Sequence, residues 1–153
     1  MIEQIMFWVV LGHFVGDYLL QSKKMALGKS ARGWPGVWQC TKHCLAYTCA
    51  VAWSSLIGLG HVLDPASALL VVAMIFVSHY PIDRWSLGGR WLQMIKGRAL
   101  LEHPGVLVQE RKSVEVVAMN HAFAAIVYTV VDNTMHILLL TAGFAVLLHW
   151  GVL

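Results

Sequence analysis

Charge is scarce in this 153-residue chain, which has eight acidic and eleven basic residues, 12% of the total. Soluble domains carry about twice that share. Apolar residues make up 58% of the chain, and the mean hydropathy is +0.66. Because small chains bury only a modest fraction of their surface, a soluble domain of this length could not hide so much apolar area. The composition argues against a soluble single-domain enzyme and a disordered chain, and the net charge of +3 against a nucleic-acid-binding protein.

Cysteine is scarce as well. The three cysteines, Cys40, Cys44 and Cys49, form no C-x-x-C pair, and their odd number argues against a disulfide framework. No basic residue precedes the first apolar stretch, which itself contains His13 and Asp17. We therefore expect this stretch to be a retained membrane segment rather than a cleaved signal peptide.

Long apolar runs dominate the chain, and they predict an all-α, polytopic membrane bundle that forms one domain, residues 1–153. We expect four spans, at residues 4–22, 43–63, 66–84 and 130–150. The region 116–131 is predicted to be a half-inserted or interfacial helix. The alternative is two short spans that turn at Asp132-Asn133-Thr134, but such a hairpin would leave backbone groups unsatisfied in lipid.

The basic residues predict the orientation of these spans, because all eleven fall within two stretches, 23–42 and 84–112. Lysine and arginine gather on the cytoplasmic side of membrane proteins. The segments 23–42 and 85–115 are therefore predicted to be cytoplasmic, and both termini to lie outside. The lysine and arginine side chains could also attract anionic lipid headgroups.

Ionisable residues inside the spans are the candidates for function, because each costs about 2.5–3.5 kcal/mol at mid-membrane. Six of them form pairs four residues apart, which places both members of a pair on one helix face. The pairs are His13 with Asp17, His79 with Asp83, and Asp132 with His136, and His43 adds a further imidazole.

With the predicted orientation, all seven side chains fall in the same leaflet, and helix bundles hold metal ions with such groups. Imidazole and carboxylate together suit zinc, manganese or iron. The set fits two ions with a bridging aspartate, which we favour, or one ion with the remaining carboxylates as orienting groups and general base. Other interpretations stay open: hydrogen-bonded packing histidines, ion pairs of Asp17 with Lys24 and of Asp83 with a loop arginine, and a helix cap at Asp132.

Several further positions bear on this site. Pro81 stands between His79 and Asp83 and lacks a backbone donor, so it could kink the third span and alter that pair. His121 could line the site from the half-inserted helix. Gly12 and Gly16 form a G-x-x-x-G pattern, which indicates close helix packing more often than dimerisation.

The motifs resemble those of a known group of sequences. The stretch from Gly12 to Gln21 resembles the H-x-x-x-D-x-x-x-Q start of an uncharacterised family of small integral membrane proteins from bacteria and their phages. The resemblance continues in order through His43, the His79–Asp83 segment and the Asp132–His136 segment. This chain departs from the family pattern at Asn133, where glutamine is common, and at Pro81. The resemblance implies a bacterial inner-membrane location and supports the site, but it implies no particular reaction. A looser similarity, in helix-borne His/Asp pairs alone, links the chain to membrane-bound metal-dependent hydrolases.

Three functions fit these features. The first is an intramembrane metal-dependent hydrolase acting on a phosphoester of a lipid or polyprenyl carrier, with Asp17 or Asp83 as bridging ligand or general base. Its candidate phosphate contacts are Gln21, Lys24 and Arg84. The second is a metal or proton carrier, although no polar path continues outward through the second and third spans. The third is a non-catalytic module with a structural metal, which joins a homo-oligomer or a larger membrane complex.

Overall fold

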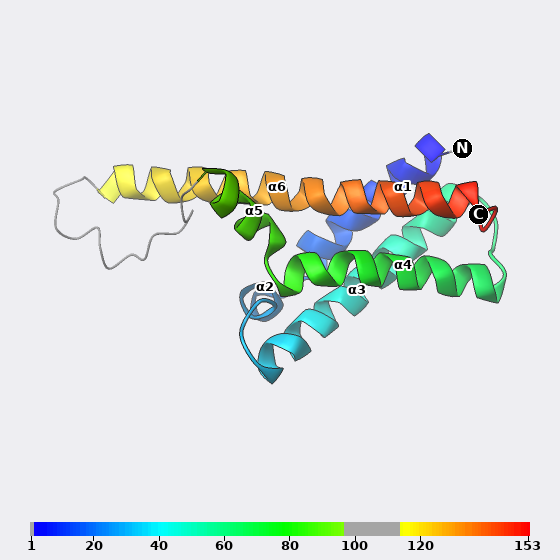
Figure 1. Ribbon diagram of the computed structural model, residues 1–153, viewed down its shortest axis with the longest axis horizontal. Coiled ribbons are helices and arrows are strands. Elements are labelled where there is room, and N and C mark those ends of the chain that lie inside the picture. Colours follow the sequence, from blue (N-terminus) through cyan, green and yellow to red (C-terminus); the bar gives the residue numbers. More distant parts are fainter. Residues whose placement is uncertain (1, 97–113) are drawn as a thin grey trace.

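The chain folds into helices throughout the part that the structure describes. The computed structural model covers the backbone of residues 2–96 and 114–153 and the side chains of residues 2–95 and 122–153. No strand occurs in these residues, so the predicted all-α fold is confirmed. The elements are α1 (Ile2–Phe14), the short π-helix η1 (Val15–Leu19), α2 (Lys23–Gly28), α3 (Trp34–Leu59), α4 (Pro65–Arg84), α5 (Leu87–Lys96) and α6 (Val114–His149) (Figure 1).

Four of the helices form a closed ring around one interior. α1 packs on α3, α3 on α4, α4 on α6, and α6 on α1. In Figure 1 the two chain termini lie at one end of this bundle, and α2 and α5 lie toward its other end. The apolar core occupies the half near the termini, where Ile5, Val51, Ile75 and Phe144 are fully buried. The polar interior begins where this cluster stops.

The turn between α3 and α4 follows from local sequence. α3 ends at Leu59 and is capped by Gly60, whose φ of 72° suits glycine. Asp64 then caps α4, since its Oδ1 accepts hydrogen bonds from the backbone N–H groups of Ala66 and Ser67. Pro65 follows at the first helical position, where its missing donor costs nothing. The predicted break at Asp64-Pro65 is therefore present.

The end of the chain differs from the prediction. The region 116–131 and the predicted span 130–150 belong to one helix, α6, without the turn at Asp132-Asn133-Thr134 that the alternative required. The polar side chains at that point bond back to their own helix, because Asn133 donates to the carbonyl of Thr129 and Thr134 to that of Val130. Such back-bonding lets polar residues sit within a helix. His103 and most of the predicted segment 85–115 lie outside the described residues, as does the side chain of His121.

Two helices in the described part of the chain are long and apolar enough to cross a membrane. They are α4 and the Ala122–His149 portion of α6. α1 has 13 residues and η1 continues it directly with five more, so this helical segment is slightly shorter than the ~20 residues of a full crossing. The outer face of the bundle is nonetheless apolar, because large side chains are exposed on all four ring helices: Phe7, Trp53, Leu69, Val77, Phe123 and Leu138. Large exposed apolar surfaces mark membrane or protein contacts.

The G-x-x-x-G pattern brings α1 and η1 against α3. A Cβ on Gly12 would stand 2.8 Å from Oγ of Ser54, and one on Gly16 would stand 2.7 Å from the ring and 3.0 Å from the Cα of Tyr47. Only glycine permits this approach. The pattern therefore serves packing within the chain at this contact, and it places the start of η1 beside the polar interior.

Candidate metal centre

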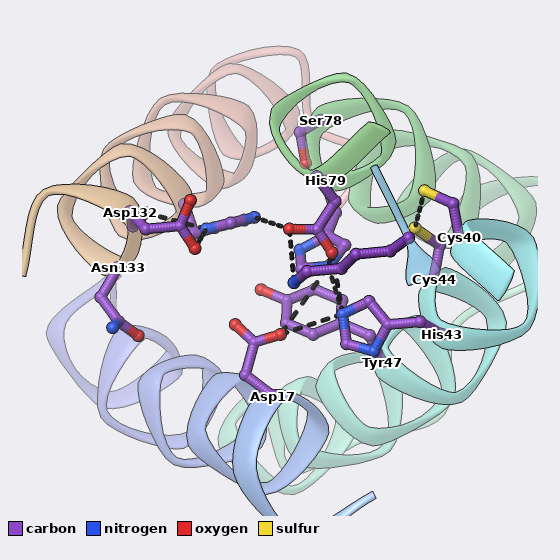
Figure 2. A network of polar contacts seen from close by, with 12 residues as sticks. Asp17, Cys40, His43, Cys44, Tyr47, Ser78, His79, Asp132 and Asn133 are labelled. Atoms are coloured by element: carbon purple, nitrogen blue, oxygen red, sulfur yellow. Dashed lines mark hydrogen bonds and ion pairs between the residues drawn. The ribbon is translucent and has the colours of Figure 1, made fainter. Parts of the chain in front are cut away.

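Four ionisable side chains from three elements converge in the polar half of the bundle. Asp17 comes from η1, His43 from α3, and His79 and Asp83 from α4. Figure 2 shows Asp17, His43 and His79 pointing toward one another between the helices. One ligand atom from each of the four lies within 4.8 Å of the others. The structure thus brings together four of the seven metal ligands that the sequence predicted.

The ligand atoms of the three most buried side chains form a nearly equilateral triangle. Nε2 of His43 lies 3.0 Å from Nε2 of His79 and 2.9 Å from Oδ2 of Asp83. The third side, from His79 Nε2 to Asp83 Oδ2, is 3.1 Å. Ligand atoms on bonds of about 2.1 Å to one ion lie about 3.0 Å apart in octahedral geometry and about 3.4 Å apart in tetrahedral geometry. The triangle therefore has the size of three adjacent ligands on a single ion.

Asp17 stands at the fourth corner, on the more open side. Its Oδ1 lies 3.1 Å from Nε2 of His43 and 3.8 Å from Nε2 of His79. The Asp17 side chain is 11% exposed, whereas that of Asp83 is 1% exposed. Asp17 is therefore the ligand that a molecule entering from outside would meet first.

Hydrogen bonds among the described residues leave the two carboxylate oxygens of this centre unsatisfied. Oδ1 of Asp17 and Oδ2 of Asp83 are buried and accept no hydrogen bond from them. The facing Nε2 atoms of His43 and His79 can share only one proton between them. Buried charges are paired or bind metals, and one divalent cation would satisfy all four atoms together. The donor set therefore fits a metal ion.

Lys29 lies beside this centre, although no motif in the sequence indicated it. Its Nζ donates to Oδ1 of Asp83 at 2.8 Å. Burial opposes the charge on Lys29, but the Asp83 carboxylate outweighs that effect, so the pKa of Lys29 is raised. The sequence suggested that Asp83 would pair with a loop arginine and Asp17 with Lys24. In the described residues the ion pair is instead Lys29 with Asp83.

Asp132 and His136 meet Asp83 in a second group of three, whose ligand atoms also lie within 4.8 Å of one another. Nδ1 of His136 donates to the backbone carbonyl of Asp132, at 2.8 Å, which turns Nε2 toward Oδ1 of Asp83, 3.7 Å away. The Lys29 ammonium contacts the same Oδ1. A positive charge therefore already stands where a second ion would bind.

His13, the seventh predicted ligand, lies outside both groups. Its Nδ1 is 2.9 Å from the hydroxyl of Tyr47, and its Nε2 is 2.7 Å from Oδ1 of Asn133. The nearer carboxylate oxygen of Asp17 is 3.4 Å from Nδ1. With both ring nitrogens engaged, the fully buried His13 ring orients its neighbours rather than offering a ligand atom.

Tyr47 and Asn133 are two further residues of the site that the sequence analysis did not select. The Tyr47 ring stacks on His79, with centroids 3.6 Å apart and planes 20° apart, and its hydroxyl contacts His13. Asn133 joins three helical segments, because it contacts His13 and its Nδ2 lies 2.7 Å from the Tyr18 hydroxyl. A signal existed for both: Tyr47 follows His43 by one helical turn, and Asn133 is within the Asp132–His136 motif.

A pocket of about 220 Å³ opens beside the centre. Asp17, Gln21, Lys29 and Asp132 line it, together with Tyr18, Tyr128 and Asn133. The Gln21 amide nitrogen lies 3.3 Å from each ring nitrogen of His43. Gln21, one of the three predicted phosphate contacts, therefore lies beside the metal centre.

The other two predicted substrate contacts lie elsewhere. Lys24 is exposed on α2 and does not line this pocket. Arg84 lines a different hollow, with Arg32 and Arg90. The reason is helical geometry, because Arg84 follows Asp83 directly and adjacent helical residues point about 100° apart.

The π-helix η1 positions Asp17. The backbone N–H of Leu20 donates to the carbonyl of Val15, five residues earlier, at 3.0 Å. π-turns inside α-helices insert one residue and often occur at functional sites. This turn widens the end of α1 at Asp17, and the i,i+4 pattern of His13 and Asp17 gave no indication of it.

Comparison with known proteins gives one match. Residues 5–150 match the family model described as "Protein of unknown function (DUF3307)". The chain belongs to the DUF3307 family. Membership in an uncharacterised family, which the motifs predicted, is therefore confirmed. No curated protein and no solved structure matches this DUF3307 chain.

Proposed function

We propose that this protein is a membrane-embedded hydrolase that uses one divalent metal ion. The observation that carries the proposal is the triangle of His43, His79 and Asp83, with Asp17 at a fourth corner that faces a pocket. Two imidazoles and one carboxylate are a ligand set of catalytic metal sites, which keep a position open for water or substrate. A closed structural site would have no such pocket at its most exposed ligand.

The number of ions follows from Lys29. A second ion would bind Asp83 Oδ1, Asp132 and His136, but the Lys29 ammonium stands 2.8 Å from that oxygen. Two positive groups cannot share this carboxylate oxygen without strong repulsion. We therefore assign one ion to the centre and let Lys29 serve as the second positive charge, in place of the two-ion arrangement that the sequence favoured.

The side chains divide the chemical work by position. A divalent ion supplies a Lewis acid and makes water a nucleophile near neutral pH. Asp17, at the pocket side, accepts a proton from water as the water oxygen bonds to phosphorus, and it returns that proton to the leaving ester oxygen as the ester P–O bond breaks. Lys29 and Gln21 line the same pocket and bind the phosphoryl oxygens, and Asp132 also lines it.

The substrate class follows from the surroundings of the pocket. The bundle exposes apolar side chains on every ring helix, and among the described basic residues Lys29 contacts Asp83 while Arg32, Arg84 and Arg90 line the neighbouring hollow. We place the ring helices α1, α3, α4 and α6 in the bacterial inner membrane with both termini outside, so that the centre lies at the depth of the cytoplasmic headgroups. A phosphoester of a lipid or polyprenyl carrier reaches such a site from within the bilayer.

The test begins with the metal. The full chain, purified in mild detergent without chelators, should carry about one equivalent of zinc, manganese or iron by elemental analysis. With phospholipid and polyprenyl-phosphate substrates, the wild-type protein should release product that mass spectrometry detects. Asp17→Asn keeps the His43, His79 and Asp83 ligands, so it should bind the ion more weakly and lose turnover even when the metal is added to saturation. Wild-type protein with less than about a tenth of an equivalent would contradict the proposal.

A matched control separates catalysis from a structural role. Asp64→Asn changes a carboxylate at the far end of α4, outside the centre, and should leave both metal content and turnover unchanged. If chelation unfolds the wild-type protein and no substrate turns over, the ion is structural and the hydrolase proposal fails.

A further inference from the structure

A second hollow lies where the connection from α2 to α3 meets the turn between α4 and α5. Its volume is about 400 Å³, and three arginines and two serines contribute to its wall. These residues are Arg32, Arg84, Arg90, Ser30 and Ser86. They come from two segments 50 or more residues apart in sequence. The hollow is therefore formed by the tertiary fold and not by one local stretch of sequence.

The three guanidinium groups have no acidic partner in the part of the chain that the structure describes. Every ion pair there joins Lys29 or a histidine to an aspartate, and none includes an arginine. Like charges around one hollow repel one another. An arrangement of this kind is stable when an anion occupies the space between the charges.

The ligand chemistry follows from the donors. Guanidinium is planar and offers paired N–H donors that match the spacing of phosphate oxygens. Serine hydroxyls add neutral donors, and Trp85, which also borders the hollow, is 51% exposed, as is typical of an interfacial anchor. We propose that this hollow binds the phosphate group of an anionic ligand, at a position separate from the metal centre.

The backbone is shaped to build this hollow. Ser86 has a φ of 47°, a left-handed conformation that costs free energy in a residue other than glycine. Its carbonyl accepts a hydrogen bond from the N–H of Arg90 at 3.0 Å, which begins α5 at once after α4 ends. The sharp turn returns Arg90 to the side on which Arg84 stands.

The hollow lies next to the metal centre, because two residues of the centre are each followed in sequence by a residue that lines the hollow. Asp83 and Lys29 meet at the centre, and the residues that follow each of them, Arg84 and Ser30, line the hollow. A phosphate bound here would lie against the outer side of the Lys29–Asp83 ion pair. The binding itself requires no metal, so it is independent of the proposed hydrolysis.

Binding can be measured as thermal stabilisation of the full chain in detergent. Phosphatidylglycerol should raise the unfolding midpoint by roughly 5 °C at saturation, and diacylglycerol with the same acyl chains, which lacks the phosphate, should not. Inorganic phosphate forms a third arm. Protection by the lipid alone identifies a headgroup as the source, whereas equal protection by inorganic phosphate identifies a free phosphate ligand, and both support the phosphate site.

Two double variants that each remove two positive charges distinguish binding at the hollow from nonspecific attraction to the basic surface. Arg32→Gln with Arg90→Gln should abolish the shift and remove phospholipid that co-purifies, as counted by native mass spectrometry. Lys23→Gln with Lys24→Gln, on the exposed face of α2, should retain both. Absence of protection by either phosphate in the wild type, or equal loss in the two variants, would overturn the inference. The arginine variant should keep its metal content, so failure here is distinct from failure of the hydrolase.

Discussion

The two oxygens of Asp83 face opposite partners: Oδ1 accepts a hydrogen bond from the Lys29 ammonium at 2.8 Å, and Oδ2 lies 2.9 Å from Nε2 of His43. One carboxylate thus links a fixed cation to the proposed ligand triangle. A charged pair buried to this degree is costly to break from one side, because the remaining charge has no solvent to stabilise it.

Asp83→Asn is expected to remove the ion. The amide keeps the size of the side chain but lacks the charge that holds both the metal and Lys29. Elemental analysis should find less than about a tenth of the wild-type metal, and the variant should also be less stable, by roughly 3 kcal/mol. Unchanged metal content in Asp83→Asn would place the ion elsewhere.

Lys29→Met should have opposite effects on the apoprotein and the metal-bound protein. Without metal, the buried Asp83 carboxylate loses its only ammonium partner among the described residues, and the unfolding midpoint should fall. With metal, the loss of a repelling charge should tighten binding by about tenfold or more, ~1.4 kcal/mol. Thermal melts with chelator and with added manganese or zinc test both effects. Lys24→Met, at an exposed site, is the control and should match the wild type in both.

His43→Gln should lose metal binding, whereas His13→Gln should lose stability. His43 supplies one of the three ligand atoms of the triangle, so its replacement should abolish metal binding. His13 instead contacts Tyr47 and Asn133, so its replacement should retain the ion and lower stability by about 1–3 kcal/mol. Loss of metal from His13→Gln to the same extent as from His43→Gln would show that His13 is a ligand.

Gly16→Ala should displace the site without changing any ligand. The added methyl group would stand 3.0 Å from the Cα of Tyr47, and overpacking of this kind costs about 1–3 kcal/mol. We expect lower stability and weaker metal affinity. Gly89→Ala adds the same group where the nearest atom, in Tyr128, is 3.5 Å away, and it should be tolerated.

The predicted topology can be tested by labelling. In a chain whose exposed Cys49 is replaced by alanine, Leu153→Cys should react with an impermeant thiol reagent added outside intact cells. Reaction only after the membrane is opened would reverse the orientation and move the centre to the other leaflet.

The sequence predicted the helices and the candidate ligands better than it predicted their partners. Ionisable residues in apolar runs are conspicuous because burying them is costly, and the i,i+4 spacing indicated which helix faces they share. Asp17, His43, His79 and Asp83 could be selected for these reasons. Periodicity carries no information about which helices lie next to each other, however, so it could not show that His13 would be engaged by Tyr47 and Asn133.

Lys29 shows the other limit of sequence reasoning. It was one basic residue among five in a segment that the positive-inside pattern already explained, and only the fold brings it to Asp83. The continuity of α6 was missed for a different reason: the apolar region from residue 116 to 153 is too long for one crossing, so the sequence predicted an interfacial helix followed by a separate span. The alternative turn at Asp132-Asn133-Thr134 is also absent, because two of these side chains bond to carbonyls of the preceding helical turn.

The extra residue in η1 makes the centre depend on chain length as well as on residue identity. A relative one residue shorter within Val15–Leu19 could keep every histidine, every aspartate and the apolar pattern, and still turn its carboxylate about 100° around the helix axis. Deletion of Val15 would separate the two requirements, because it removes one apolar residue and no proposed ligand, and a loss of metal affinity would then report the change of helical register.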